Sequence, residues 1–293
     1  MIKRLANLKE MQSSEYGACM DEINAIARRG NLTEYKTYSR LWEYPWAWLQ
    51  LQKVFPVPKG VKVLDIGSEM SPMAWFLATK GFDVTLSDRT ARYVALWRRA
   101  SKALETGVTK VILNAQRLDW PTASTDVCTS FSVFEHLPDQ KTALSEMARV
   151  IKPGGLLLLT FDICEPDQGM TFPAWNGRAP TIGEFDELLR ENPWFETAPE
   201  GAAWNIEDMM PFLAWNRTTA PHHNYVTGGL LLRRNEKLFE ETESTQRQRR
   251  WSYVWRSTTN RLLWCILPTH GTCAYNFGSR VRKAVYQMCR KTR

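Results

Sequence analysis

The fold is decided by residues 61–68, which read VKVLDIGS. A short apolar run that ends at a glycine is typical of a buried strand followed by a tight turn. Further along the chain, four more apolar runs alternate with three segments of helical pattern. The runs cover residues 83–87, 110–113, 126–132 and 156–161, and the helical segments cover residues 72–80, 92–106 and 140–150. Strands that alternate with helices pair in parallel through right-handed crossovers, so we expect an α/β fold with a doubly wound, mostly parallel sheet.

Composition divides the 293 residues into three parts, and 44% hydrophobic with 24% charged residues excludes a disordered chain. Residues 1–58 have a helical pattern and an aromatic cluster, and we expect a helical N-terminal arm or lid. Residues 59–233 hold the alternating strands and helices. Their last part, 164–233, is rich in Trp, Pro and Gly, and we place it on the substrate side. Residues 234–293 are expected to form a basic, amphipathic C-terminal tail.

The positive charge is confined to this tail. Residues 244–293 contain eleven Lys and Arg and no acidic residue, so the rest of the chain is mildly acidic although the whole carries +7. Arginines alternate there with Trp and aliphatic residues at helical spacing, which predicts a basic helix on an anionic membrane surface. Docking on the body of the protein, dimerisation and RNA binding are alternatives, with RNA less favoured. The sequence leaves the oligomeric state open.

The chain lacks the features of a secreted or membrane-spanning protein. No apolar run approaches the roughly 20 residues of a membrane span, and the first residues, MIKRLANLKEM, lack the apolar segment of a secretory signal. The six cysteines are scattered without a C-x-x-C pair, so we expect reduced thiols and neither a disulfide framework nor a zinc site. We therefore expect a cytoplasmic protein, with peripheral contact to the inner face of the membrane through the tail.

Polar residues follow the first two strands, at the edge where ligands of such sheets bind. Asp65, Gly67 and Ser68 lie at the end of the first strand, and a glycine there lets a ligand approach the backbone. Asp88 ends the second strand, where a carboxylate accepts both hydroxyls of a ribose; an exposed turn residue is the alternative. Glu69 stands where G-x-G-x-x-G needs its second glycine, so the sequence disfavours NAD and FAD.

Three further segments complete a pattern. They read NAQRLDWP at 114–121, SVFEHLPD at 132–139 and MARVIKPGG at 147–155. Together with VLDIGSEMSP at 63–72, and in this order, they resemble a class I S-adenosylmethionine-dependent methyltransferase of the type 11 group. The resemblance covers residues 59–163 and implies a Rossmann-like seven-stranded sheet. A helix at 181–190 and a strand at 225–232 would complete it.

The resemblance implies S-adenosylmethionine (SAM) as the cofactor and S-adenosylhomocysteine as its product. The loop at Gly67 faces the methionine part, Asp88 holds the ribose, and Asn114 with the Ala115 backbone reads the adenine. The implied cofactor residues are Asp65, Gly67, Ser68, Asp88, Arg89, Asn114, Ala115 and Phe131. Two positions depart from the family pattern: Glu69 replaces a loop glycine, and Asn114 replaces an Asp but still offers an acceptor and a donor pair.

His136 and Asp162 are the candidate catalytic residues. Methyl transfer to a hydroxyl requires a base, and His136 lies just past the fourth strand. Asp162 ends the neighbouring fifth strand, where a carboxylate can orient the imidazole. Loop packing is the alternative role for His136, and His222-His223 is a competing base or a pair at the mouth of the site. We expect no metal, because acidic residues after the fifth strand are more simply explained as solvated.

Aromatic residues in the arm and in the 164–233 segment indicate an acceptor pocket, since aromatic walls suit a ring or the face of a sugar. The candidates for acceptor contact are Tyr38, Glu135, Trp175, His222 and His223. The segment after the fourth strand lacks the N/D-P-P-Y/F pattern of DNA base methylation, so DNA is not expected. The favoured function is O-methylation of a small molecule or a lipid-linked glycan, as in polysaccharide biosynthesis. N- or C-methylation of a small metabolite and a non-catalytic SAM-fold binding module are the alternatives.

Overall fold

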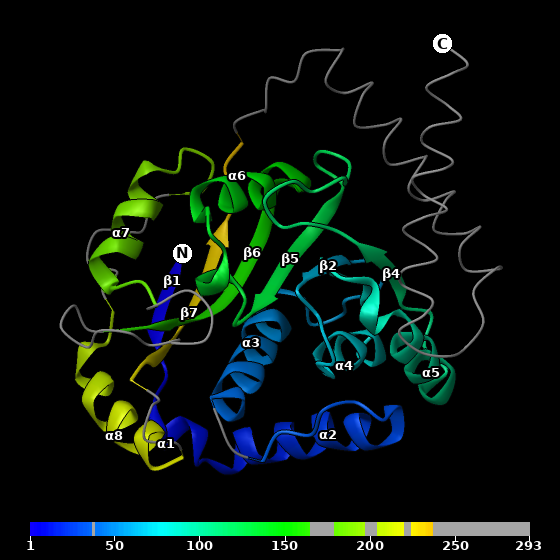
Figure 1. The fold of residues 1–293 in the computed structure, drawn as a ribbon, viewed down its shortest axis with the longest axis horizontal. Coiled ribbons are helices and arrows are strands. Elements are labelled where there is room, and N and C mark those ends of the chain that lie inside the picture. Colours follow the sequence, from blue (N-terminus) through cyan, green and yellow to red (C-terminus); the bar gives the residue numbers. More distant parts are fainter. Residues whose placement is uncertain (37–38, 165–178, 197–203, 220–223, 237–293) are drawn as a thin grey trace.

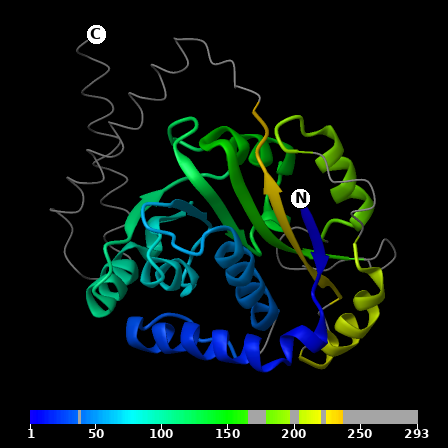
Figure 2. The ribbon, with the colours of Figure 1, turned by 180° about the vertical axis from the view of Figure 1, so that it is seen from behind.

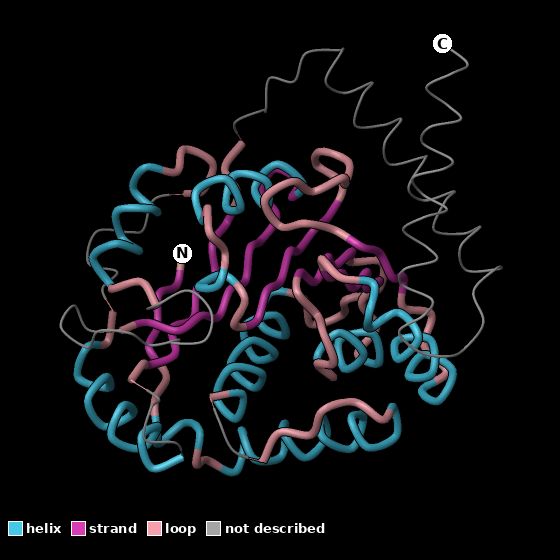
Figure 3. The backbone as a smooth tube through the Cα atoms, viewed as in Figure 1, coloured by secondary structure: helices cyan, strands magenta, loops and turns pink. Residues whose placement is uncertain are grey.

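One seven-stranded sheet runs through the computed structural model, which describes residues 1–36, 39–164, 179–196, 204–219 and 224–236. The sheet lies between helices on both sides (Figures 1 and 3). Its strand order is β1-β7-β6-β5-β2-β3-β4. The strands are Ile2–Leu5 (β1), Lys62–Ile66 (β2), Asp83–Asp88 (β3), Thr109–Ile112 (β4), Thr125–Phe131 (β5), Ile151–Ile163 (β6) and Val226–Arg233 (β7).

The pairing confirms the predicted doubly wound, mostly parallel sheet. β2 pairs in parallel with β3 and with β5, β3 with β4, and β5 with β6. β7 runs antiparallel to both β6 and β1. From β2 the chain moves outward through β3 and β4, then returns to place β5 and β6 on the other side of β2. Ligands of such sheets bind at this switch point, outside the carboxyl ends of the strands.

The first residues of the chain form strand β1. The helical pattern of residues 1–58 did not predict this strand. Ile2 lies opposite Leu231, and Leu5 lies opposite Gly228 at the edge of the sheet. Four residues with Lys and Arg at the centre are too few to show the alternation by which a strand is recognised. The rest of the described arm is helical, as expected.

Helices connect the strands and cover the sheet. Their bounds are Leu8–Met11 (α1), Ser14–Gly30 (α2), Arg40–Val54 (α3), Met73–Thr79 (α4), Val94–Leu104 (α5), Gln140–Val150 (α6), Ile182–Glu191 (α7) and Met209–Thr219 (α8), with short 3-10 turns at Ala91–Tyr93 (η1), Phe134–His136 (η2) and Ile206–Asp208 (η3). α2 packs across α3, α4 and α5, while α7 and α8 lie beside the β1–β7 edge (Figures 1 and 2). Within the described ranges, no helix is both long enough and apolar enough to cross a membrane.

The aromatic cluster of the arm packs α3 against the sheet. Trp42, Tyr44 and Trp46 are all buried, and the rings of Trp42 and Trp46 stack with centroids 5.2 Å apart. A Cβ atom on Gly229 of β7 would stand 2.8 Å from the Trp46 indole. The close approach of α3 to β7 therefore depends on the absence of a side chain at Gly229.

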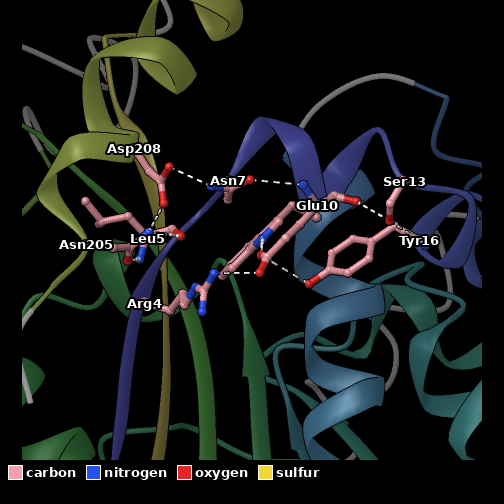
Figure 4. A network of polar contacts seen from close by, with 9 residues as sticks. Arg4, Leu5, Asn7, Glu10, Ser13, Tyr16, Asn205 and Asp208 are labelled. Carbon is pink, nitrogen blue, oxygen red and sulfur yellow. Dashed lines mark hydrogen bonds and ion pairs between the residues drawn. The ribbon is translucent and has the colours of Figure 1, made fainter.

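Polar contacts around Glu10 tie β1 to the helices of the arm (Figure 4). The Glu10 carboxylate accepts hydrogen bonds from Arg4 at 2.6 Å and from the Trp42 indole at 3.0 Å. The Asn7 side chain caps α1 through the Glu10 amide and donates to Asp208 beside α8. These contacts fix the first strand, α3 and α8 relative to one another.

Replacing Gly229 by Ala is expected to lower the free energy of unfolding by about 1–3 kcal/mol, because the new methyl group collides with Trp46. Chemical denaturation followed by tryptophan fluorescence measures the change. Gly107→Ala is the control, since a Cβ atom there meets nothing within 4 Å. Equal unfolding free energies for the two variants would contradict the proposed packing of α3.

Candidate functional site

The residues predicted to bind a ligand gather at the carboxyl edge of the parallel strands. β2 ends directly before Gly67. β3 ends at Asp88, and β5 ends at Phe131. Asp162 lies near the end of β6, the strand next to β5. Because parallel strands end on the same side of the sheet, the motifs that follow them meet at the switch point between β2 and β5.

A left-handed turn at Gly67 joins the end of β2 to its neighbours. The backbone amides of Gly67 and Ser68 both donate to the carbonyl oxygen of Ser87 on β3, each at 2.9 Å. Gly67 has a φ of +77°, and a Cβ atom there would stand 2.5 Å from Cγ2 of Val133. Other residues rarely adopt this φ and would collide with Val133, so only glycine suits the position. The turn is fixed against β3 on one side and the loop after β5 on the other.

Asp65 holds this turn from inside the protein. Its side chain is buried, and its two oxygens accept hydrogen bonds from the hydroxyls of Ser68 at 2.5 Å and Thr129 at 2.7 Å. Burial raises the pKa of Asp65 to about 6, although the two hydrogen bonds act in the opposite direction. These contacts fasten β2, β5 and the Gly67 turn together, while direct contact of Asp65 with a cofactor stays a prediction.

Asp88 lies where β3, β4 and the Gly67 turn meet. It is 8% exposed, its Oδ1 accepts from the Thr90 amide at 2.9 Å, and its backbone carbonyl accepts from Leu113 at 3.0 Å. Burial raises the pKa of Asp88, the Thr90 hydrogen bond lowers it, and the charge of Glu69 raises it again. The carboxylate is therefore fixed at the edge predicted to hold a ribose.

Glu69 keeps the backbone shape of the glycine that it replaces in the family pattern. Its φ is +41°, in the left-handed region. The Tyr93 hydroxyl donates to its Oε1 at 3.0 Å, Arg92 lies 3.6 Å from the same oxygen, and the Trp97 indole donates to its carbonyl at 2.6 Å. The side chain is 62% exposed and is held beside η1 and α5.

The remaining predicted cofactor residues also reach this edge. Asn114 follows β4 and is exposed, with Oδ1 accepting from the Gln116 amide at 3.0 Å, and Ala115 next to it is buried. Arg89 is exposed directly after Asp88. Phe131 is buried against the Tyr44 ring, edge to face at 5.4 Å. Their adenine and methionine contacts stay predictions.

Two buried acids lie where β5 and β6 end. Glu135 is 2% exposed and Asp162 is 6% exposed, and the Asp162 amide donates to Glu135 Oε1 at 3.2 Å. Oδ1 of Asp162 makes no hydrogen bond to any residue that the structure describes. Burial raises the pKa of both acids well above the ordinary range; the charge of Asp162 raises that of Glu135 further, and the charge of Glu43 raises that of Asp162.

His136 is half-buried in η2, directly after Glu135 in the sequence. Burial lowers its pKa, the charge of Arg40 lowers it further, and Glu69 raises it. The charges that act on Asp162 are instead those of Glu43 and Arg40. The predicted pairing of Asp162 with His136 stays a prediction.

α3 brings an ion pair between Arg40 and the buried Glu43 to the same place, and the sequence analysis did not predict Glu43 as part of the site. Glu43 is fully buried; its carboxylate accepts from Ser39 at 2.6 Å, from Ser132 at 2.9 Å and from Thr160. Arg40 donates to both Glu43 and Ser132. The i, i+3 spacing of Arg40 and Glu43 was visible, but no pattern indicates that a charged pair in a helical arm will be buried against β5 and β6.

Several predictions fall outside the described ranges. Four of the five acceptor candidates and the tail predicted to contact a membrane belong to this group. They are Tyr38, Trp175, His222, His223 and residues 244–293. Glu135 is the acceptor candidate that the structure describes, in the turn η2 that follows β5.

Asp65→Asn is expected to change how stability depends on pH. The pKa of Asp65 is higher in the folded protein than in the unfolded chain, so wild type loses stability as the pH rises through about 6. Between pH 4 and pH 7, the free energy of unfolding of wild type should fall by about 3 kcal/mol relative to Asp65→Asn, which carries no charge. Urea titrations across this range test it, with exposed Asp21→Asn as the control. Parallel pH profiles of wild type and Asp65→Asn would refute the effect.

Comparison with known proteins agrees with this geometry. Residues 64–159 match a family model described as a methyltransferase domain. Methyltransferase GfsG of Streptomyces halstedii is 34% identical over 113 residues, which cover 38% of this chain and 41% of that protein. The ubiquinone biosynthesis O-methyltransferase of Pectobacterium atrosepticum is 34% identical over 99 residues, covering 33% of this chain and 40% of the relative. The chain thus spans about two fifths of the length of these curated relatives.

Solved structures share the fold. The [4+2]-cyclase SpnF superposes with a TM-score of 0.51 at 17% identity, over 75% of this chain and 94% of that one. At this identity the likeness concerns the arrangement of the sheet and helices. The family match, the sequence relatives and the sheet order agree, and together they support a class I S-adenosylmethionine-dependent methyltransferase domain at residues 64–159.

Proposed function

We propose that the chain transfers a methyl group from SAM to a hydroxyl of a small molecule or a lipid-linked glycan in the cytoplasm. The observation that carries the proposal is that the Gly67 turn, Asp88 and Asn114 lie at the carboxyl ends of the neighbouring parallel strands β2, β3 and β4. A nucleoside needs a carboxylate for its ribose, an amide or backbone group for its base, and a turn that lets it approach the backbone. All three are supplied within the described part of the chain.

The donor set fits this cofactor although Glu69 replaces a glycine. A side chain at position 69 can block the turn or leave it open, and here the carboxylate is bound to Tyr93 beside η1. Asp88 would hold the ribose, and Asn114 with the Ala115 backbone would hold the adenine. When bound, SAM supplies a methyl group on a positively charged sulfur that leaves readily.

His136 is proposed to take the proton of the acceptor hydroxyl. Its pKa lies below the ordinary value because of burial and the nearby charge of Arg40, so the imidazole is neutral at neutral pH and can accept a proton. Glu135 and Asp162, whose pKa values are raised by burial, tend to keep their protons. As neutral carboxyl groups, they can donate hydrogen bonds to an acceptor oxygen.

The choice of a hydroxyl acceptor is supported by a relative. The Pectobacterium protein is named an O-methyltransferase, although it matches only a third of this chain. The rival is N- or C-methylation of a small metabolite, which needs no base at His136. A non-catalytic module is the other rival, and the likeness to SpnF illustrates that this fold also occurs in a protein named a cyclase. Contact of residues 244–293 with a membrane remains part of the proposal only as a means to reach a lipid-linked acceptor.

Asp88→Ala is expected to weaken S-adenosylhomocysteine binding about 10- to 100-fold, because hydrogen bonds to a charged group contribute about 1.5–3 kcal/mol. Isothermal titration calorimetry measures the change. Asp83→Ala, at the opposite end of β3, is the matched control and should bind like wild type. A wild-type chain that binds neither SAM nor its product would favour the non-catalytic reading and overturn the proposed activity.

His136→Ala is expected to retain cofactor affinity and to lose about 10²- to 10⁴-fold in turnover, the usual contribution of a general base. Because the base must be neutral and its pKa is lowered, wild-type turnover should be constant near neutral pH and fall only below about pH 6.5. The acceptor for this assay comes from a mass-spectrometric screen of phenols and glycans for products heavier by one methylene group. Unchanged turnover in His136→Ala would remove this residue from the mechanism and favour N- or C-methylation.

A further inference from the structure

Two buried polar side chains face each other across β6 and β7 at the candidate site. Asp162 on β6 lies directly opposite Thr227 on β7 in their antiparallel pairing. Thr227 is fully buried, and Asp162 is 6% exposed. Within the part of the chain that the structure describes, Oδ1 of Asp162 and Oγ1 of Thr227 make no hydrogen bond. A buried polar atom without a partner is costly, so a bound group that satisfies both atoms would remove that cost.

The two side chains lie close together. The Thr227 carbonyl accepts from the Ala6 amide on β1, and the Asp162 amide donates to Glu135. The backbone groups of the two facing residues therefore point away from each other, which is the geometry of a non-hydrogen-bonded pair, in which the side chains approach most closely. Burial raises the pKa of Asp162 most strongly, and the Thr227 hydroxyl lowers it, as a neighbouring donor does.

Alternation along the strands turns both side chains toward α3. Thr160, two residues before Asp162, donates to a side chain of α3, and Gly229, two residues after Thr227, lies against a ring of α3. Residues two apart in a strand share one face of the sheet. The Asp162 amide is bonded to Glu135, the residue that precedes the candidate base. The pair therefore faces the region in which the acceptor is proposed to bind.

The pair suits an uncharged group that both donates and accepts a hydrogen bond. An ionised Asp162 accepts while Thr227 donates, and a protonated Asp162 donates while Thr227 accepts, so a hydroxyl complements either form. A carboxylate would meet two buried acids, Glu135 and Asp162. An ammonium group would bring a charge into a buried place where burial opposes the ionised form of Asp162. A hydroxyl is the group that enters without such a charge.

We propose that Asp162 and Thr227 together bind a second hydroxyl of the acceptor, next to the hydroxyl that is methylated, and that Thr227 determines the preference for such diols. The inference rests on the proposed function, because it assigns atoms that hold the acceptor of that reaction. It narrows the acceptor to molecules with two neighbouring hydroxyls. These hydroxyls belong either to an aromatic ring or to a saturated ring such as a sugar.

Binding of matched probes to the full chain tests this pair. NMR titrations of the chain loaded with S-adenosylhomocysteine compare cyclohexane-1,2-diol with cyclohexanol, and catechol with phenol. Wild type should bind the diol about 10-fold more tightly than the mono-ol in at least one series, because a mono-ol leaves the buried pair unsatisfied. The series that shows the preference tells whether the ring is saturated or aromatic. Protonated 2-aminocyclohexanol should bind no better than cyclohexanol.

Substitutions at Thr227 assign the preference to its hydroxyl. Thr227→Val keeps the shape without the hydroxyl, so diol affinity should fall about 10-fold while mono-ol affinity stays within about twofold. Thr227→Ser retains a hydroxyl and should retain the preference. Thr109→Val, at the exposed start of β4, is the matched control and should behave like wild type. Equal affinity for diols and mono-ols in wild type, no binding in either series, or a preference that survives in Thr227→Val overturns the proposal.

The stability of the ligand-free chain separates this role from an internal one. If the Thr227 hydroxyl serves a ligand, Thr227→Val should leave the urea midpoint of unfolding unchanged or raise it, because the change removes a buried hydroxyl without a partner. Thr129→Val is the matched contrast: its hydroxyl donates to Asp65 at 2.7 Å, so its loss should lower the midpoint. A lower midpoint for Thr227→Val as well would show that the protein already uses this hydroxyl, and would overturn the proposal.

Failure of the proposed function would give a different result. A chain that does not bind S-adenosylhomocysteine overturns the proposed methyl transfer, and the same probe titrations of the free protein still test Asp162 and Thr227. A chain that binds S-adenosylhomocysteine but does not distinguish diols from mono-ols overturns only the binding of a second hydroxyl by this pair.

Discussion

The turn at Gly67 is the constraint on which the site depends. Two successive amides donate to one carbonyl oxygen on β3, and the Val133 side chain occupies the space that any Cβ would need. This contact sets the relative positions of the ends of β2, β3 and β5. The carboxylate of Asp88 and the residues after β5 can face one ligand only because these three strand ends are held together.

The candidate site contains buried charged groups, which are costly unless they are paired or neutralised. Asp65 is satisfied by two hydroxyls, and Glu43 by three hydroxyls and Arg40. Glu135 and Asp162 avoid an unpaired buried charge in a different way. Burial raises their pKa values and so favours their neutral forms. The helical arm thus contributes charged groups to the candidate site through α3, and the Trp rings of α3 hold this helix against β7.

Sequence alone predicted the features that depend on local pattern. Apolar runs located six strands, and the glycine after the first of them located the turn. Three features could not be predicted because they arise from tertiary contacts. β1 is too short to show alternation, the burial of Glu43 depends on hydroxyls from β5 and β6, and the direction of Glu69 depends on Tyr93. The sequence predicted Asp65 as a cofactor residue but not that its carboxylate would accept hydrogen bonds from Ser68 and Thr129.

The central claim is that the nucleoside of SAM binds at the switch point between β2 and β5. A crystal structure of the chain with S-adenosylhomocysteine tests it most directly. In that structure the ribose hydroxyls are expected to contact the Asp88 carboxylate, the adenine is expected to lie beside Asn114, and Glu69 is expected to remain bound to Tyr93. A nucleoside bound elsewhere, or a Glu69 side chain that has turned into the site and filled it, would contradict binding of the nucleoside at this switch point.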